Sequence, residues 1–143
     1  MCRWKLRLRS VCAGAAVAVG LGLSPVARAA DAQESAGNAE ELTVLFDEGA
    51  VVFGTLCVSC HDAAGGDGQA PALSGHPSMG ARDHIVRQVL RGNVEKGMPA
   101  FAGQLSDRQI AAVATYIRNA WENAHGVVRE ADARKVRDEA TGR

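Results

Sequence analysis

Two cysteines and a histidine lie within five consecutive residues, Cys57-Val58-Ser59-Cys60-His61. In a helical turn Cys57 and Cys60 share a face, and His61, four residues after Cys57, lies on the same side. This arrangement can add both sulfurs across the two vinyl groups of a haem while the imidazole reaches the iron. The spacing therefore predicts one covalently bound haem c, with Cys57 and Cys60 as thioether anchors and His61 as an axial iron ligand.

Three other readings of the same residues remain open at this stage. A thioredoxin-like C-x-x-C requires a βαβ context, and the sequence contains no convincing strand. A structural zinc site needs four ligands, which His76 could complete only with an unfamiliar spacing. A disulfide between Cys57 and Cys60 would leave His61 without a role.

The first 29 residues have the layout of a secretory signal peptide. They carry five basic residues and no acidic one, and a 13-residue apolar run, Val11 to Leu23, precedes Ala27-Arg28-Ala29. We expect cleavage near Ala29/Ala30 and a periplasmic product. The alternative is an uncleaved membrane anchor, but the apolar run is shorter than the ~20 residues of a spanning helix. No other stretch could span a bilayer, so we expect no stable membrane span in the mature chain.

Charge and cysteine content of the exported part narrow the function further. Residues 30–143 hold 11 basic and 16 acidic residues, a net charge of −5, which makes nucleic acid an unsuitable partner. Cleavage removes Cys2 and Cys12 and leaves Cys57 and Cys60, so one disulfide at most is available to a small exported domain. A covalent haem would supply the missing core.

The elements that must position these residues are helical. Apolar residues recur at spacings of three and four in Glu41–Leu56 and Arg82–Arg91, and Ser106 with Gln109 forms a capping box that begins a last helix. Seven Gly or Pro mark Asp62–Ala81 as a long irregular loop. The fold class is therefore all-α. Around this core we expect a flexible tail at 30–40 and a charged extension at 127–143, either a short solvated helix or a frayed end.

The order of these motifs resembles the class I c-type cytochromes, the small single-haem cytochromes c of bacteria, over about Glu41 to Asn123. Gly49 and Phe53 precede Cys57 by eight and four residues, and Tyr116-Ile117 lies in the last helix. The resemblance implies a cytochrome c domain at 41–126, a bundle of three to five helices wrapped around the haem, with the first and last helices crossing beside it.

The resemblance also assigns the other side of the iron. Gly97-Met98-Pro99-Ala100-Phe101 is similar to the family's methionine loop, in which Met98 is the second axial ligand and Pro99 stiffens the approach. The competing donors are the Met79 sulfur and three histidines that could give bis-His ligation, namely His76, His84 and His125.

Two further positions follow from the same resemblance. The backbone carbonyl of Pro71 takes the role of orienting His61, because ligating histidines donate their second ring N–H. Asp62 stands where relatives usually carry glycine, and we expect the turn to survive, because Asp tolerates left-handed backbone.

With both axial positions filled, no site remains for a substrate. We therefore expect an electron carrier, not an enzyme, with redox proteins as partners, either free or as the cytochrome subunit of a dehydrogenase or oxidase complex. A haem enzyme or gas sensor with a labile Met98 is the alternative from another class. Because residues 30–143 contain only two lysines, we expect docking through an apolar patch with scattered arginines, such as Arg82, Arg87 and Arg91.

Overall fold

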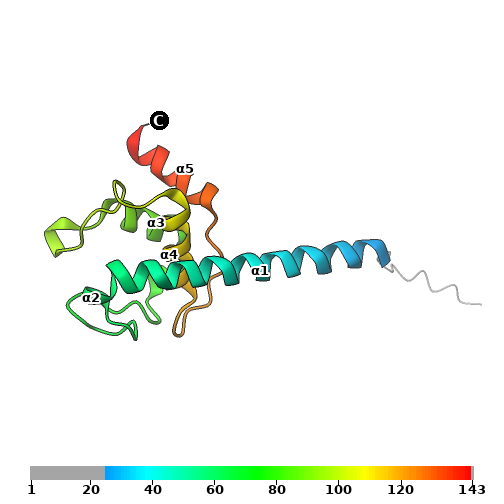
Figure 1. Ribbon diagram of the computed structural model, residues 1–143, viewed down its shortest axis with the longest axis horizontal. Helices are drawn as coiled ribbons and strands as arrows, with labels where there is room; N and C mark the ends of the chain where they lie inside the picture. Colours follow the sequence, from blue (N-terminus) through cyan, green and yellow to red (C-terminus); the bar gives the residue numbers. More distant parts are fainter. Residues whose placement is uncertain (1–24, 143) are drawn as a thin grey trace, which may run out of the picture.

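The computed structural model describes the backbone of residues 25–142, with the side chains of that range except 25–32 and 35. It contains five α-helices and two short 3-10 helices (Figure 1): α1 Pro25–Leu56, α2 Val58–His61, η1 Pro77–Gly80, α3 Arg82–Arg91, η2 Val94–Lys96, α4 Asp107–Asn119 and α5 Glu130–Thr141. Within 25–142 the only β pairing is an isolated bridge between Asn93 and Met98. The predicted all-α class is confirmed.

Residues 1–24 of the predicted signal peptide lie outside the described residues. Among the helices that are described, none combines the length and the apolar character needed to cross a bilayer.

Helices α1 and α4 cross at a glycine. A Cβ built on Gly49 would lie 2.7 Å from Tyr116 Cβ and closer still to the backbone carbonyl of Ala112. The rings of Phe46 and Phe53, one turn to either side of Gly49 on α1, lie 5.0 and 5.2 Å from the Tyr116 ring. Glycine thus permits the close approach and the aromatic side chains fill its flanks, which confirms the expected crossing of the first and last helices of the cytochrome domain.

Helix α3 packs its apolar face against α4, as its spacing predicts. The predicted bounds Arg82–Arg91 are confirmed, and Gly92 ends the helix with a φ of +65°. The predicted capping box is confirmed as well: Gln109 N–H donates to Ser106 Oγ, and Ser106 N–H donates to Gln109 Oε1. The buried side chains that α3 and α4 contribute to the core include Ile85, Val86, Val89, Leu90, Ile110, Val113, Ala114 and Ile117.

The charged extension folds into α5 and packs against α3 and α4. Val128, Ala133 and Val136 are completely buried in the core, and Thr115 Oγ1 exchanges hydrogen bonds with the Val128 backbone. A solvated helix and a frayed end were the two expectations for 127–143, and the structure differs from both. Few apolar residues suffice among many charges, because Ala133 and Val136 are one turn apart on the same side of α5 and Val128 is buried just before the helix begins.

Helix α1 also extends further toward the N-terminus than the sequence analysis expects. It continues through 30–40, where a flexible tail was predicted. This segment is rich in alanine, which has the highest helix propensity, and lengthening an anchored helix avoids the cost of nucleation. Arg129, which pairs with Glu41 and donates to Asn38 Oδ1, ties the segment to the body.

We predict that Gly49→Ala lowers the free energy of unfolding by about 1–3 kcal/mol, because the new methyl group displaces α4. Gly54→Ala is the matched control, since Gly54 lies on the same helix with nothing within 4 Å of its Cβ position. We expect Gly54→Ala to raise stability by about 0.5–1 kcal/mol. Urea unfolding of the haem-loaded proteins measures both, and equal effects would contradict the crossing.

Candidate haem site

The segment from Cys57 to His61 forms one helical turn directly after α1. Cys57 N–H donates to Phe53 O at 2.9 Å, and the N–H groups of Cys60 and His61 both donate to Cys57 O, at 3.1 and 3.0 Å. The chain therefore keeps a helical course across the boundary between α1 and α2. The three side chains lie within a single turn, as the spacing predicts, and all three are half-buried.

Both thiols are free and half-buried. Burial raises the pKa of the Cys57 thiol to about 11, with a further contribution from Cys60. Redox-active cysteines have lowered pKa values, because the thiolate is the reacting species. The raised pKa and the absence of strands from residues 25–142 both count against a thiol oxidoreductase.

The imidazole of His61 carries an unsatisfied polar atom. Its Nδ1 is buried and has no hydrogen-bond partner among the described residues. A buried polar atom without a hydrogen bond lowers the stability of the fold. A hydrogen-bond acceptor for Nδ1 would remove this cost and fix the orientation of the imidazole ring. The hydrogen bond to the Pro71 carbonyl is not formed in this structure, and the orienting role of Pro71 stays a prediction.

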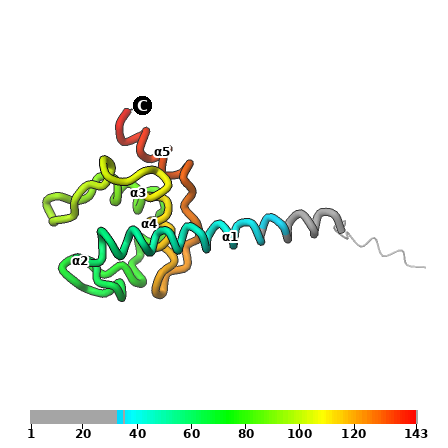
Figure 2. Tube along the Cα trace, in the orientation of Figure 1, coloured from blue at the N-terminus to red at the C-terminus, as the bar shows by residue number. Residues whose placement is uncertain are grey.

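The long loop after His61 folds back over α2 (Figure 2). Asp62 begins it with a φ of 62°, so this turn is left-handed without glycine, as expected. Ala70 N–H donates to Cys60 O at 3.1 Å, and Leu73 N–H donates to Gly65 O at 2.8 Å. A Cβ on Gly68 would lie 2.6 Å from Cys60 O, so the close return of the loop requires glycine there.

Trp121 and Asn123 hold this loop in place, and the sequence analysis did not assign that role to either. Helix α4 ends at Asn119, and Trp121 lies in the following turn with a φ of 57°. Trp121 Nε1 donates to Ala63 O at 3.0 Å, and its ring leaves no space for a Cβ on Gly65. The only sequence signal for this contact is the glycine cluster around Gly65, which the sequence analysis interpreted only as evidence for a loop.

Asn123 is buried and makes three hydrogen bonds that join the loop to α4. Its Oδ1 accepts from Gly75 N–H, and its Nδ2 donates to the carbonyl oxygens of Leu73 and Ile117. An asparagine in a turn gives no sequence signal of such a role, because its two partners in the loop, Gly75 and Leu73, lie 48 and 50 residues away along the chain.

The methionine loop is anchored at its base. Asn93 and Met98 exchange both backbone hydrogen bonds, at 2.9 and 3.0 Å. A Cβ on Gly92 would collide with the carbonyl oxygens of Met98 and Pro99. Met98 is half-buried at the edge of the hydrophobic core, and Gln88 Nε2 donates to its sulfur at 3.3 Å. Gln88 is a further site residue that the sequence analysis missed.

The competing axial donors occupy other environments. Met79 is buried within the core, with 3% of its surface exposed. His76, His84 and His125 are exposed, and His76 Nδ1 lies 2.7 Å from Ser78 Oγ. These surroundings are typical of packing and surface roles, and they leave Met98 as the sulfur in a loop built to hold it.

The attachment motif and the methionine loop lie at the same end of the molecule. In Figure 1, α2 and the yellow-green η2 segment are both opposite the projecting half of α1. Several half-buried apolar side chains pack against the hydrophobic core, as Cys57 and Met98 do. They include Val52, Val58, Leu73, Tyr116 and Trp121. Two thiols, an imidazole, a thioether and an apolar lining match the donor set of a haem c.

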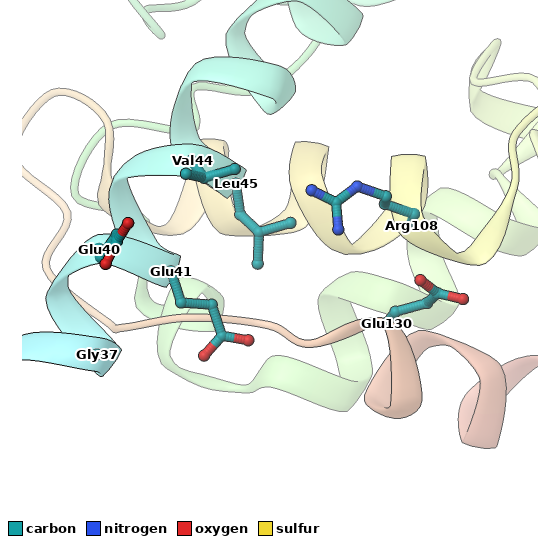
Figure 3. A pocket seen from close by; sticks show the side chains of 7 residues that line it. All are labelled: Gly37, Glu40, Glu41, Val44, Leu45, Arg108 and Glu130. Atoms are coloured by element: carbon teal, nitrogen blue, oxygen red, sulfur yellow. The ribbon is translucent and has the colours of Figure 1, made fainter. Parts of the chain in front are cut away.

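The structural zinc reading finds no support. In the described part of the chain, no three His, Cys, Asp or Glu side chains converge as a metal site would require. A cavity of about 340 Å³ lies elsewhere, between α1, α4 and α5, and its lining includes Glu40, Glu41, Arg108 and Glu130 (Figure 3). None of the four predicted haem residues lines it.

Comparison with known proteins agrees with this donor set. The family model described as cytochrome c oxidase, cbb3-type, subunit III, matches residues 44–117. Cytochrome c6 of Thermostichus vulcanus is 36% identical over 118 residues, which cover 79% of this chain and 90% of that protein. No solved structure matches significantly.

Cytochrome subunits of dehydrogenases are similar over a shorter share of their length. The fructose dehydrogenase cytochrome subunit of Gluconobacter japonicus is 31% identical over 106 residues, which are 63% of this chain and 22% of that subunit. The cytochrome c subunit of the quinone alcohol dehydrogenase of Gluconacetobacter polyoxogenes is 33% identical over 104 residues, again 22% of its length. With a family match across more than half its residues and a cytochrome c6 matched over nine-tenths of that relative, the chain belongs to the haem-binding c-type cytochromes.

Proposed function

We propose that the protein is a single-haem electron carrier whose iron is held between His61 and Met98. The observation that carries the proposal is the helical turn Cys57–His61, with both thiols half-buried and an unpartnered imidazole nitrogen. When bound, the haem iron supplies a one-electron couple between Fe(III) and Fe(II).

The residues around the site have separate roles in holding the haem and its iron. Cys57 and Cys60 hold the macrocycle through thioethers, so the cofactor stays bound in both redox states. His61 supplies one axial nitrogen, and the Pro71 carbonyl orients its ring. Met98 supplies a soft thioether, which favours Fe(II) and raises the reduction potential. Both axial positions are then filled by the protein, which suits electron transfer better than catalysis on a bound substrate.

The relatives favour a free carrier over an integral subunit. The cytochrome c6 match covers nine-tenths of that protein, whereas the dehydrogenase subunits are matched over 22% of theirs. Export to the periplasm after cleavage near Ala29/Ala30 would bring the chain to the compartment where redox carriers of this type are matured. The alternative is that the protein is the electron-accepting cytochrome subunit of a dehydrogenase or oxidase complex.

Docking would use apolar surface next to the site more than charge. Two of the three arginines proposed for docking are engaged: Arg82 pairs with Asp83 and Asp132, and Arg87 pairs with Glu139. Val94, four residues before Met98, is 75% exposed. We therefore assign the contact surface to Val94 and Arg91, which is exposed and has no ion pair with a described residue.

We predict that haem is attached through the two cysteines of this turn. The protein from a host with the maturation machinery keeps its haem after denaturing electrophoresis, and its mass exceeds the bare polypeptide by one haem. Cys57→Ser with Cys60→Ser loses the haem stain completely, while Ser59→Ala, between them, keeps it. A colourless wild-type protein with the mass of bare polypeptide would overturn the proposal.

Replacing Met98 tests the axial assignment and the alternative of an open iron site. We expect Met98→Ala to lower the reduction potential, remove the charge-transfer band of Fe(III)–sulfur coordination and bind CO stoichiometrically as Fe(II). Met79→Leu, a volume-conserving change in the core, leaves all three unchanged. If the wild type already binds CO readily, the protein is a haem enzyme or sensor and not a carrier.

If docking is mainly apolar, the rate of electron transfer to a partner should depend weakly on salt concentration and strongly on the side chain of Val94. We expect Val94→Asp to slow electron transfer to a redox partner about tenfold, since burying a valine is worth about 1.5 kcal/mol. Val44→Asp, on an exposed valine that lines the distant cavity of Figure 3, is the control. A steep fall of the wild-type rate with ionic strength would contradict apolar docking.

A further inference from the structure

Helix α5 lies beyond the family match, which ends at residue 117, yet it is bound to the segment that follows the methionine loop. The link is Arg137. Its Nη1 donates to Ala102 O at 2.5 Å, its Nη2 donates to Leu105 O at 2.8 Å, and its Nε lies 2.6 Å from Asp107 Oδ1. One guanidinium thus joins α5 to the 102–105 segment and to the first turn of α4.

This contact is sheltered, which makes it stronger than an ordinary surface ion pair. The side chains of Arg137 and Asp107 are 18% and 19% exposed. Asp107 is the first residue of α4, where a carboxylate is favoured by the helix dipole, and the planar guanidinium can satisfy three acceptors in fixed directions. A lysine cannot donate to all three acceptors, because its ammonium group lacks the planar arrangement of N–H donors on separate nitrogens.

The methionine loop is held at its other points by backbone contacts. The bridge with Asn93 fixes Met98 itself. Beyond Pro99, Phe101 is buried, and the N–H groups of Phe101 and Ala102 donate to the carbonyl oxygens at the end of α3, on Val89 and Leu90. Arg137 of α5 binds the same short segment through the Ala102 carbonyl. The segment is therefore hydrogen-bonded to both α3 and α5.

We propose that Arg137 is a positioning residue that keeps the methionine loop closed and so holds the Met98 sulfur on the haem iron. The proposal rests on the proposed function, in which Met98 is the axial ligand. A loop of this kind opens locally at a lower free energy than the whole protein unfolds. Any exogenous ligand that replaces Met98 binds only the open form, so its apparent affinity reports how often the loop opens.

Arg134 provides a matched control on the same helix. It also pairs with Asp107, at 3.3 Å, and with Glu130, at 2.6 Å. Its side chain is 58% exposed, and its hydrogen bonds go to side chains and not to the carbonyl oxygens of the loop. The two arginines therefore share charge, helix and one partner, and they differ in their contact with the 102–105 segment.

The test titrates imidazole into the haem-loaded Fe(III) protein and follows the loss of the Fe(III)–sulfur band. We expect Arg137→Met, which keeps the apolar stem and loses every donor, to bind imidazole about tenfold more tightly than the wild type. Arg137→Lys should lie between the two, and Arg134→Met within about twofold of the wild type. Amide hydrogen exchange provides a second readout: residues 100–105 should exchange faster in Arg137→Met, with α1 unchanged.

Each other outcome has a definite meaning. Unchanged imidazole affinity in Arg137→Met, or an equal change in Arg134→Met, overturns the proposal. Equal acceleration of exchange in α1 and in 100–105 also overturns it, because Arg137 would then stabilise the whole fold and not the loop. If Arg137→Met does not fold, the Lys variant decides the question by the same criteria. A wild type without the sulfur band rejects Met98 as ligand, and with it the proposed function, before any variant is compared.

Discussion

The close approach of α1 and α4 at Gly49 is the constraint on which the rest of the structure depends. A side chain at this position would overlap the backbone of α4, so the two helices can pack at this distance only through glycine. Phe46, Phe53 and Tyr116 then pack around the contact. Cys57 follows directly after α1, and its N–H donates to Phe53 O. The position of the attachment motif is therefore set by the crossing, two helical turns away.

Helix α4 also controls the long loop that covers the motif. Directly after the helix ends, Trp121 packs on Gly65 and Asn123 bonds to Leu73 and Gly75. A 20-residue loop rich in glycine has a large conformational entropy when free, and these few contacts at both of its halves restrict it. The attachment motif and the loop that covers it are thus both held in place by α4 and the turn that follows it. Such a rigid arrangement suits a redox centre, which must change charge with little structural rearrangement.

Charged residues complete the assembly where apolar surface is scarce. The extension adds three buried apolar residues, and its further contacts include ion pairs of Arg129, Arg134 and Arg137. Most of these pairs are exposed and contribute little. The pair between Arg137 and Asp107 differs, because it is sheltered and shares its guanidinium with two backbone carbonyls.

The local features could be predicted from the amino-acid sequence. They are the helical turn that groups Cys57, Cys60 and His61, the bounds of α3, the capping box of α4 and the glycine of the helix crossing. Each depends on residues within a few positions of one another or on a family motif. The sequence alone did not determine the packing of α5, the exclusion of Trp121 from α4, or the roles of Gln88, Asn123 and Arg137. Their partners lie 10 to 58 residues away along the chain, and only the folded chain brings such groups together, because hydrophobic periodicity records that a face is buried but not which surface buries it.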